Sequence, residues 1–152
     1  YAEDPATGFL PSVGRLEHFD LGDSGRIETG VAEGDTISPF YDPMIAKLVA
    51  SGDGRDEAIG ALAAMLDEVE VWPVRTNAAF LLNAVLDEEF GEGRIDTGFI
   101  PRKLDALLPD GEVDETIWRA AAVIALADEE EQPLAGFRLN APPRPSVVLG
   151  FG

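Results

Sequence analysis

The chain of 152 residues is acidic: 29 Asp and Glu against 11 Lys and Arg give a formal charge of −18. This balance argues against nucleic acid as a partner, because phosphate binding needs a clustered cationic surface. The absence of cysteine excludes disulfides, thiol nucleophiles and thiolate metal sites, and no apolar run approaches the ~20 residues that a membrane span requires.

The first 52 residues are rich in glycine and proline and are expected to form short strands joined by turns. Residues 26–31 (RIETGV) alternate like a half-buried strand. Residues 44–50 (MIAKLVA) are nearly continuously apolar, which favours a buried strand over a helical turn. This interpretation makes Lys47 a residue of a buried strand.

Over residues 55–67 the apolar side chains recur every three or four residues, which predicts a helix, with Asp53 as the expected N-cap. Residues 69–72 alternate as a short strand that ends at Pro73. Asn77 is expected to cap a second helix, whose apolar face is formed by Phe80, Leu81, Ala84 and Val85. Strands followed by helix, strand and helix predict an α+β fold with a mainly antiparallel sheet and packed helices.

After residue 108 the composition changes again. Residues 109–112 (PDGE) indicate a linker, and residues 115–127 predict an alanine-rich helix. Two strand-like pieces follow at residues 137–139 and 147–149. We therefore expect one domain over residues 1–108, and over residues 109–152 a linker helix and the truncated start of a second β domain.

Residues that carry chemistry are sparse. His18 is the single histidine, and a surface strand residue is favoured over a general base or metal ligand, because no second histidine, cysteine or tight carboxylate cluster offers a metal shell. Neither a nucleophile elbow nor a GxGxxG or P-loop spacing occurs. The residues alone predict no self-sufficient active site.

Three features allow two interpretations each. The pair Glu3 and Asp4 suits acid–base chemistry or Mg²⁺, but Asp4 before a proline favours a turn. Phe40 and Tyr41 form either an aromatic binding wall or a turn that leads into a strand, and the turn is favoured. Arg26 is expected to pair with a carboxylate, either within the chain or across an interface.

Five motifs taken together resemble the C-terminal domain of biotin carboxylase, the ATP-grasp component of biotin-dependent carboxylases. The motifs occur in order at residues 1–5 (YAEDP), 8–14 (GFLPSVG), 39–48 (PFYDPMIAKL), 74–77 (VRTN) and 96–100 (DTGFI). The resemblance covers residues 1 to about 104. It implies a parent enzyme that uses ATP, Mg²⁺ and bicarbonate to carboxylate biotin on a carrier domain.

The resemblance also implies roles for single residues. The family's key active-site arginine lies two residues before the position matched by Tyr1, so no catalytic residue, no metal ligand and no bound cofactor is expected in this chain. Thr97 matches a stretch near the adenosine of ATP and is expected to make a peripheral nucleotide contact. Arg26 matches an arginine of the dimer interface, although the family's aromatic residue three positions earlier is Asp23 here.

Residues 118–143 resemble the start of the domain that follows biotin carboxylase in acyl-CoA carboxylase α-subunits of the acetyl-, propionyl- or methylcrotonyl-CoA type. The partners implied are upstream ATP-grasp domains of the same chain, a biotin carrier domain, a carboxyltransferase subunit and a second copy of the chain. A cytoplasmic location without nucleic acid or membrane is expected. The alternative is a free-standing interaction and assembly module with the same fold and no catalysis.

Overall fold

The computed structural model describes residues 1–109 and 115–128, which belong to two compact units, Tyr1–Pro109 and Asp110–Gly152. The strands of the first unit are β1 (Glu3–Asp4), β2 (Leu10–Pro11), β3 (Gly14–Arg15), β4 (His18–Asp20), β5 (Arg26–Thr29), β6 (Thr36–Ile37), β7 (Ala46–Val49) and β8 (Glu70–Trp72). They form four antiparallel pairs: β1 with β2, β3 with β6, β4 with β8 and β5 with β7.

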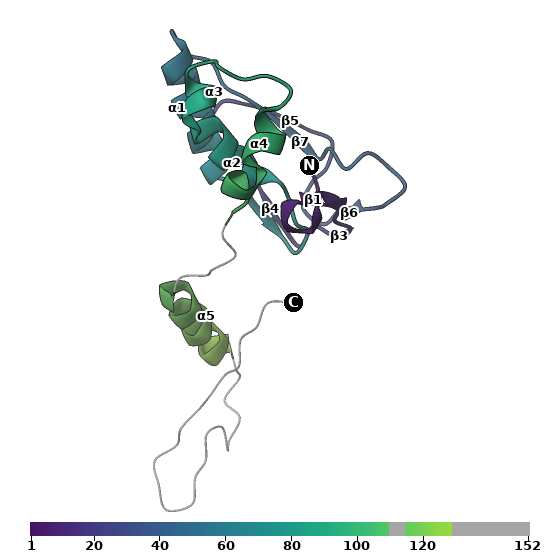
Figure 1. Ribbon diagram of the computed structural model, residues 1–152. Coiled ribbons are helices and arrows are strands. Elements are labelled where there is room, and N and C mark those ends of the chain that lie inside the picture. Colours follow the sequence, from purple (N-terminus) through teal and green to yellow (C-terminus); the bar gives the residue numbers. More distant parts are fainter. Residues whose placement is uncertain (110–114, 129–152) are drawn as a thin grey trace, which may run out of the picture. The chain divides into compact units, whose positions relative to one another are not determined.

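The helices of the first unit are the short 3₁₀ helix η1 (Pro5–Thr7) and the α-helices α1 (Arg55–Asp67), α2 (Ala78–Leu86), α3 (Glu88–Gly91) and α4 (Phe99–Leu107). Helices α1 and α2 pack side by side, and α2 also contacts α3 and α4 (Figure 1). Helix α5 (Glu115–Asp128) belongs to the second unit and confirms the helix expected from residue 115. The strand pieces expected at residues 137–139 and 147–149 lie outside the described residues.

Two apolar clusters hold the first unit together. One gathers buried side chains from the strand region: Ala2, Leu16, Ile37, Ile45 and Val74. The other lies among the helices and consists of Phe80, Ala84, Phe99 and Leu107. The buried members of the predicted α2 face, Phe80, Ala84 and Val85, confirm its helical spacing, whereas Leu81 remains 37% exposed.

Two local expectations are wrong. Asp53 does not cap α1: Gly54 occupies the N-cap position, and the Asp53 backbone N–H donates to Glu57 Oε2. The segment 44–50 does contain the expected strand, β7, but its residues alternate between half-buried and exposed. The Lys47 side chain is 58% exposed, because its ammonium reaches outward to Glu28 Oε2 at 3.1 Å.

Candidate functional site

The N-terminal motif folds as a turn, which confirms the favoured interpretation of Asp4. Asp4 Oδ1 accepts a hydrogen bond from the Ala6 N–H at 2.9 Å, and the Thr7 hydroxyl donates to the Asp4 carbonyl at 3.1 Å. Gly8 closes the turn in the left-handed region at φ 79°, where a residue without Cβ is favoured. The Asp4 carboxylate therefore accepts a hydrogen bond from the backbone of the turn through its Oδ1 atom.

No cluster in the described part of the chain has the composition of a metal site: no group of three or more His, Cys, Asp or Glu side chains there could hold a metal ion. Within the same residues, no helix is long and apolar enough to cross a membrane.

Thr97 lies exposed in the turn that precedes α4. The turn is fixed by Asp96, whose Oδ1 accepts from the Gly98 N–H at 2.8 Å and from Arg102 Nη1 at 2.7 Å. The Arg102 hydrogen bond lowers the pKa of the Asp96 carboxyl, which keeps this clamp ionised. Thr97 is thus an exposed residue on a turn of defined shape.

Arg26 lies at the start of β5 and pairs within the chain. Its guanidinium contacts Glu28 two residues along the same strand face, and Glu28 also binds Lys47 on β7. The side chain of Arg26 remains 71% exposed beside a hollow that Met65 of α1 also lines. Arg26 and Thr97 lie on different elements, and nothing in the geometry joins them into one site.

His18 is a surface residue of β4, as the favoured interpretation predicts. Its Nε2 lies 2.7 Å from Glu70 Oε2 on β8, and its Nδ1 lies 3.7 Å from Glu33 Oε2. The hydrogen bond with Glu70, more than the charges of Glu70, Glu33 and Asp20, raises the pKa of the imidazole. Both flanking carboxylates are exposed, so the group has the character of a surface ion cluster.

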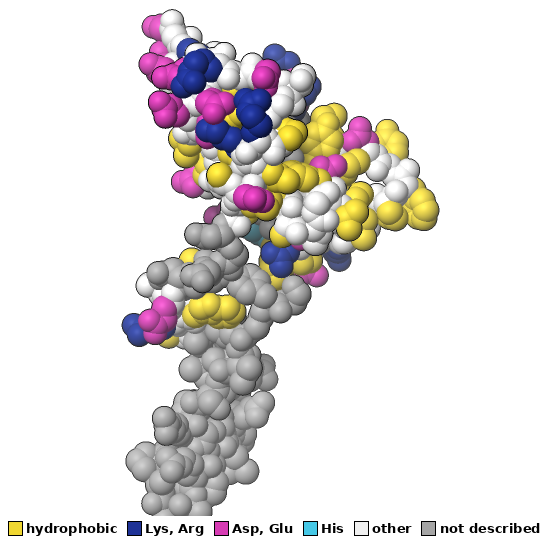
Figure 2. Space-filling view, in the orientation of Figure 1, with side chains coloured by type: hydrophobic (Ala, Val, Ile, Leu, Met, Phe, Trp, Pro, Cys, Tyr) yellow, Lys and Arg dark blue, Asp and Glu magenta, His cyan; other side chains and the backbone are white. Residues whose placement is uncertain are grey.

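The aromatic residues before β7 also adopt the favoured turn. Asp42 Oδ1 accepts from the Met44 N–H at 2.9 Å, as in an Asx turn. Phe40 and Tyr41 are 93% and 85% exposed. Hydrophobic side chains gather at the end of the unit formed by this loop between β6 and β7 (Figure 2).

An ion network between α3 and α4 was not foreseen from the sequence. Lys103 Nζ binds Asp87 Oδ2 at 2.8 Å and Glu89 Oε1 at 3.3 Å, and these hydrogen bonds lower the pKa of both carboxyls. Asp87 also accepts from the Glu89 N–H and caps α3. The sequence did contain a signal for this network, namely the adjacent basic residues Arg102 and Lys103. In a chain with 29 acidic and 11 basic residues, each basic side chain has many carboxylates with which it can pair.

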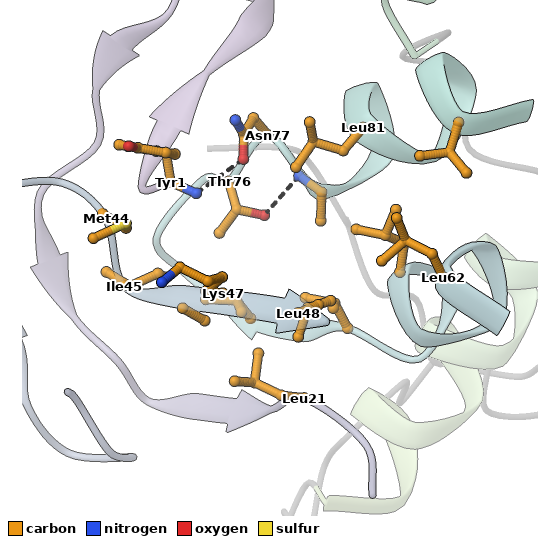
Figure 3. A pocket seen from close by; sticks show the side chains of 16 residues that line it. Tyr1, Leu21, Met44, Ile45, Lys47, Leu48, Leu62, Thr76, Asn77 and Leu81 are labelled. Atoms are coloured by element: carbon orange, nitrogen blue, oxygen red, sulfur yellow. Dashed lines mark hydrogen bonds between the residues drawn. The ribbon is translucent and has the colours of Figure 1, made fainter. Parts of the chain in front are cut away.

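The unit also contains an apolar cavity of 380 Å³ between β7 and the helices α1 and α2 (Figure 3). Tyr1, Thr76 and Asn77 lie at one side of it, and Leu62 and Leu81 line the helical wall. Among its lining side chains in the described residues, Lys47 alone is charged, and its ammonium is directed to Glu28. The cavity therefore offers shape and apolar surface rather than acid–base chemistry.

The arrangement of these elements is shared with known proteins. The family model of the biotin carboxylase C-terminal domain matches residues 1–102. The chain belongs to this family. The resemblance of the five motifs and the α+β fold are thereby confirmed.

Relatives of this biotin carboxylase C-terminal domain are much longer. The α-subunit of mitochondrial methylcrotonoyl-CoA carboxylase from Dictyostelium discoideum is 37% identical over 92% of this chain and 22% of its own length. Biotin carboxylase 2 from Bacillus subtilis is 42% identical over 68% of this chain and 24% of its own. The chain thus spans about a fifth to a quarter of these relatives.

Solved structures agree with the assignment. The biotin carboxylase domain dimer of Hydrogenobacter thermophilus 2-oxoglutarate carboxylase, in complex with MgADP, ADP and bicarbonate, has a TM-score of 0.68 and 31% identity. The similarity covers 73% of this chain and 25% of that chain. The biotin carboxylase subunit of a pyruvate carboxylase also has a TM-score of 0.68, with 32% identity.

Proposed function

We propose that this chain is the C-terminal lobe of the biotin carboxylase component of an acyl-CoA carboxylase α-subunit. The parent enzyme would use ATP, Mg²⁺ and bicarbonate to carboxylate biotin on a carrier domain. The lobe would act as a scaffold, with the ATP-grasp domains upstream in the same chain. A cytoplasmic location stays a prediction, and several relatives are mitochondrial proteins.

The observation that carries this proposal is the fixation of the backbone at Tyr1. The Ala2 N–H donates to the Pro43 carbonyl at 2.8 Å, and the Asn77 N–H donates to the Tyr1 carbonyl at 3.1 Å. Two residues that are distant in sequence therefore fix the peptide group at which the family's arginine segment would arrive. A rigid anchor of this kind supports a role in positioning a catalytic side chain supplied by the preceding residues.

The extent of the similarity favours an acyl-CoA carboxylase α-subunit. The α-subunits from Dictyostelium, rat and mouse match 92% of the chain, whereas biotin carboxylase 2 matches 68%. In these three α-subunits the similarity therefore extends past residue 108, where the carboxyltransferase-contacting domain is proposed to begin, whereas the plant α-subunits match 71–72% of the chain. Which acyl-CoA the enzyme uses would be decided by the carboxyltransferase subunit.

Two residues are proposed as contacts. Thr97, exposed on its clamped turn, would touch the adenosine of ATP from the periphery, and Arg26 would contribute to a homodimer interface. Because Arg26 already pairs with Glu28, a dimer contact would have to share or replace that partner. The described residues include no metal-binding cluster, so Mg²⁺ would be bound by residues outside this lobe.

The test is an assay of the full-length protein for ATP-dependent transfer of labelled bicarbonate to biotin. We expect activity in the full-length protein, and no bicarbonate-dependent ATP hydrolysis by residues 1–152 alone. In the full-length protein, Thr97→Ala should raise the KM for ATP while leaving kcat unchanged, as the loss of uniform binding does. Turnover by the 152-residue chain would contradict the scaffold role, and an inactive full-length protein would contradict the assignment of activity.

A further inference from the structure

The turn that carries Thr97 is closed by two hydrogen bonds to Asp96. The Asp96 carbonyl accepts from the Phe99 N–H at 3.0 Å, and Asp96 Oδ1 accepts from the Gly98 N–H at 2.8 Å. Thr97 and Gly98 are therefore the two central residues of a β-turn. Phe99 is 5% exposed and anchors the second end of the turn in the helical core, whereas Asp96 and Thr97 are exposed. The exposed half of the turn needs support from elsewhere.

Arg102 of α4 supplies this support. Its Nη1 donates to Asp96 Oδ1 at 2.7 Å, and its Nη2 lies 3.3 Å from Glu89 Oε2 on α3. Because the guanidinium is planar and rigid, its two bonds couple the position of the turn to that of α3. The Glu89 side chain is 26% exposed and that of Asp96 is 68% exposed. Arg102 thus ties an exposed turn to a better shielded helix, and we call this contact the Asp96–Arg102 clamp.

The inner end of the clamp is itself held in place. Lys103 Nζ lies 3.3 Å from Glu89 Oε1 and 2.8 Å from Asp87 Oδ2, at the N-cap of α3. Five side chains of alternating charge therefore follow one another: Asp87, Lys103, Glu89, Arg102 and Asp96. Charges in such a network keep their geometry better than an isolated surface pair does. The network spans the open arc of chain that joins α3 to α4 (Figure 1).

Gly98 leaves the space that the clamp requires. Its φ of −90° and ψ of −5° are accessible to other residues, so the backbone does not demand a glycine there. A Cβ at this position would instead lie 2.7 Å from Arg102 Nη1 and 3.2 Å from Asp96 Oδ1. Since Nη1 is the far end of a flexible side chain, the Cβ would displace the guanidinium rather than the helix. The glycine at 98 therefore lets Arg102 reach Asp96.

We propose that Arg102 is a positioning residue for the nucleotide: it holds the turn in the shape in which Thr97 meets the adenosine of ATP. Without the guanidinium the turn would have to become ordered on binding, and this ordering would weaken the binding of nucleotide. A contact that is equal in the ground state and the transition state changes KM and leaves kcat unaltered. The proposal rests on the proposed function in one respect, the contact of Thr97 with adenosine.

The test measures nucleotide binding and turnover by the full-length protein. The Kd for MgADP comes from calorimetry, and the KM for ATP and kcat come from the carboxylation assay. Arg102→Met and Asp96→Ala should each raise Kd and KM roughly three- to ten-fold, the range expected for about one hydrogen bond, with kcat unchanged. Arg102→Lys should have a smaller effect, because an ammonium can keep Asp96 as a partner but lacks the rigid fork.

Two further variants separate the position of the guanidinium from its charge. Gly98→Ala keeps the charge of Arg102 but displaces its Nη1, so it should raise Kd as Arg102→Met does. It also tests the clamp if Arg102→Met does not fold. Arg94→Met is the matched control, because Arg94 lies in the same loop and pairs with Glu92 instead of Asp96. Its loss removes one cation beside the turn and should leave Kd and KM unchanged.

A double variant shows whether Arg102 acts through the turn. Arg102→Met combined with Thr97→Ala should bind MgADP no more weakly than the weaker of the two single variants, because both changes remove the same contact. Additive effects would show that Arg102 touches the nucleotide itself and would overturn the proposal. A lowered kcat, an unchanged Kd in Gly98→Ala, or equal effects of Arg94→Met and Arg102→Met would also overturn it.

The outcomes for the clamp and for the proposed function differ. If Thr97→Ala raises KM while the clamp variants do not, the clamp alone is refuted. If the clamp variants weaken binding while Thr97→Ala does not, the Thr97 contact is refuted and the clamp acts through the backbone of the turn. A wild-type protein that neither binds MgADP nor carboxylates biotin refutes the enzymatic function and, with it, a role of the clamp in nucleotide binding.

Discussion

The guanidinium carbon of Arg55 lies 5.3 Å from the centroid of the Phe90 ring, and the same side chain hydrogen-bonds the end of α3. Arg55 Nε donates to the Gly91 carbonyl at 2.9 Å and Nη2 donates to the Phe90 carbonyl. Carbonyls in the last turn of a helix lack intrahelical partners. Arg55 donates to two of them while stacking on the ring, and the Phe90 carbonyl also accepts from the Gly93 N–H at 3.1 Å. One residue therefore joins the start of α1 to the end of α3.

Replacement of Arg55 should loosen this junction. Arg55→Met is expected to lower the free energy of unfolding by ~1–2 kcal/mol, from the lost cation–π contact and hydrogen bonds. Arg55→Lys should fall between it and the wild type, because an ammonium keeps the charge but not the planar fork of donors. Urea unfolding measures the effect.

The control for this prediction is Arg119→Met. Arg119 makes an exposed i,i+4 pair with Glu115 in α5, so its loss should change stability by less than ~0.5 kcal/mol. Equal effects of Arg55→Met and Arg119→Met would show that the Arg55 junction contributes nothing beyond a surface charge.

The sequence predicted those elements whose own residues contain the signal. Helix α1 and the apolar face of α2 follow from a helical period, and β5 follows from alternation. The cap of α1 was misplaced by one residue: Asp53 and Gly54 both suit an N-cap, and Gly54 takes the position without a side-chain hydrogen bond, while the Asp53 N–H donates to Glu57. Helix α4 was missed although Ile100, Leu104 and Leu107 recur at four- and three-residue spacing and Pro101 falls in the first turn, where a proline is tolerated.

The site was less predictable than the fold, because it depends on pairs that are distant in sequence. The Lys47 side chain is exposed because it pairs with Glu28 on the neighbouring strand. The apolar residues around Lys47 in the sequence had predicted that it would be buried. The cavity beside Tyr1 is formed by segments separated by more than 70 residues. Motifs placed the chain in its family, but no local pattern indicated that, among the described residues, β7 pairs with β5 alone.

The rings of Phe9 and Phe80 meet edge to face, with centroids 5.0 Å apart and an interplanar angle of 83°. Phe80 is 3% exposed, so Phe80→Ala should lower the free energy of unfolding by ~3–5 kcal/mol. A double-mutant cycle with Phe9→Ala should give a coupling energy of ~0.5–1.5 kcal/mol.

Phe40→Ala is the matched control for the aromatic pair, because Phe40 is 93% exposed. Its effect on stability should stay within ~0.5 kcal/mol, as for an ordinary surface substitution. A coupling energy of zero between positions 9 and 80 would contradict the ring contact.

Gly25 has φ +70°, and a Cβ at this position would lie 2.4 Å from Met65 Sδ. Gly25→Ala should therefore destabilise the fold by at least the ~1–2 kcal/mol of a left-handed non-glycine residue, with further cost from moving buried Met65. Gly60→Ala, within α1 and with open space around its Cβ, should instead stabilise by roughly 0.5–1 kcal/mol. Thermal unfolding of both variants measures the contrast, and a neutral Gly25→Ala would show that the backbone there relaxes freely.

Two ion clusters should respond to pH in opposite directions. The pKa of His18 is raised by its hydrogen bond with Glu70, so its contribution to stability is present below the unfolded pKa near 6.5 and is lost as the pH rises through the folded value. The pKa values of Asp87 and Glu89 are lowered by Lys103. Their contribution is therefore present above the unfolded values near 4 and is lost as the pH falls through the folded ones.

Single substitutions separate the contributions of these two ion clusters to stability from the general effect of the net charge of −18 on the pH dependence of unfolding. The difference in Tm between wild type and His18→Gln should be larger at pH 5.5 than at pH 8.5. The difference between wild type and Lys103→Met should stay constant between pH 5.5 and 8.5 and shrink toward pH 3, as Asp87 and Glu89 take up protons. Repeating both series in 1 M salt should reduce the His18 difference, because its partners Glu33 and Glu70 are exposed to screening. A His18 difference that grows with pH would reverse the sign and contradict a raised pKa for the imidazole.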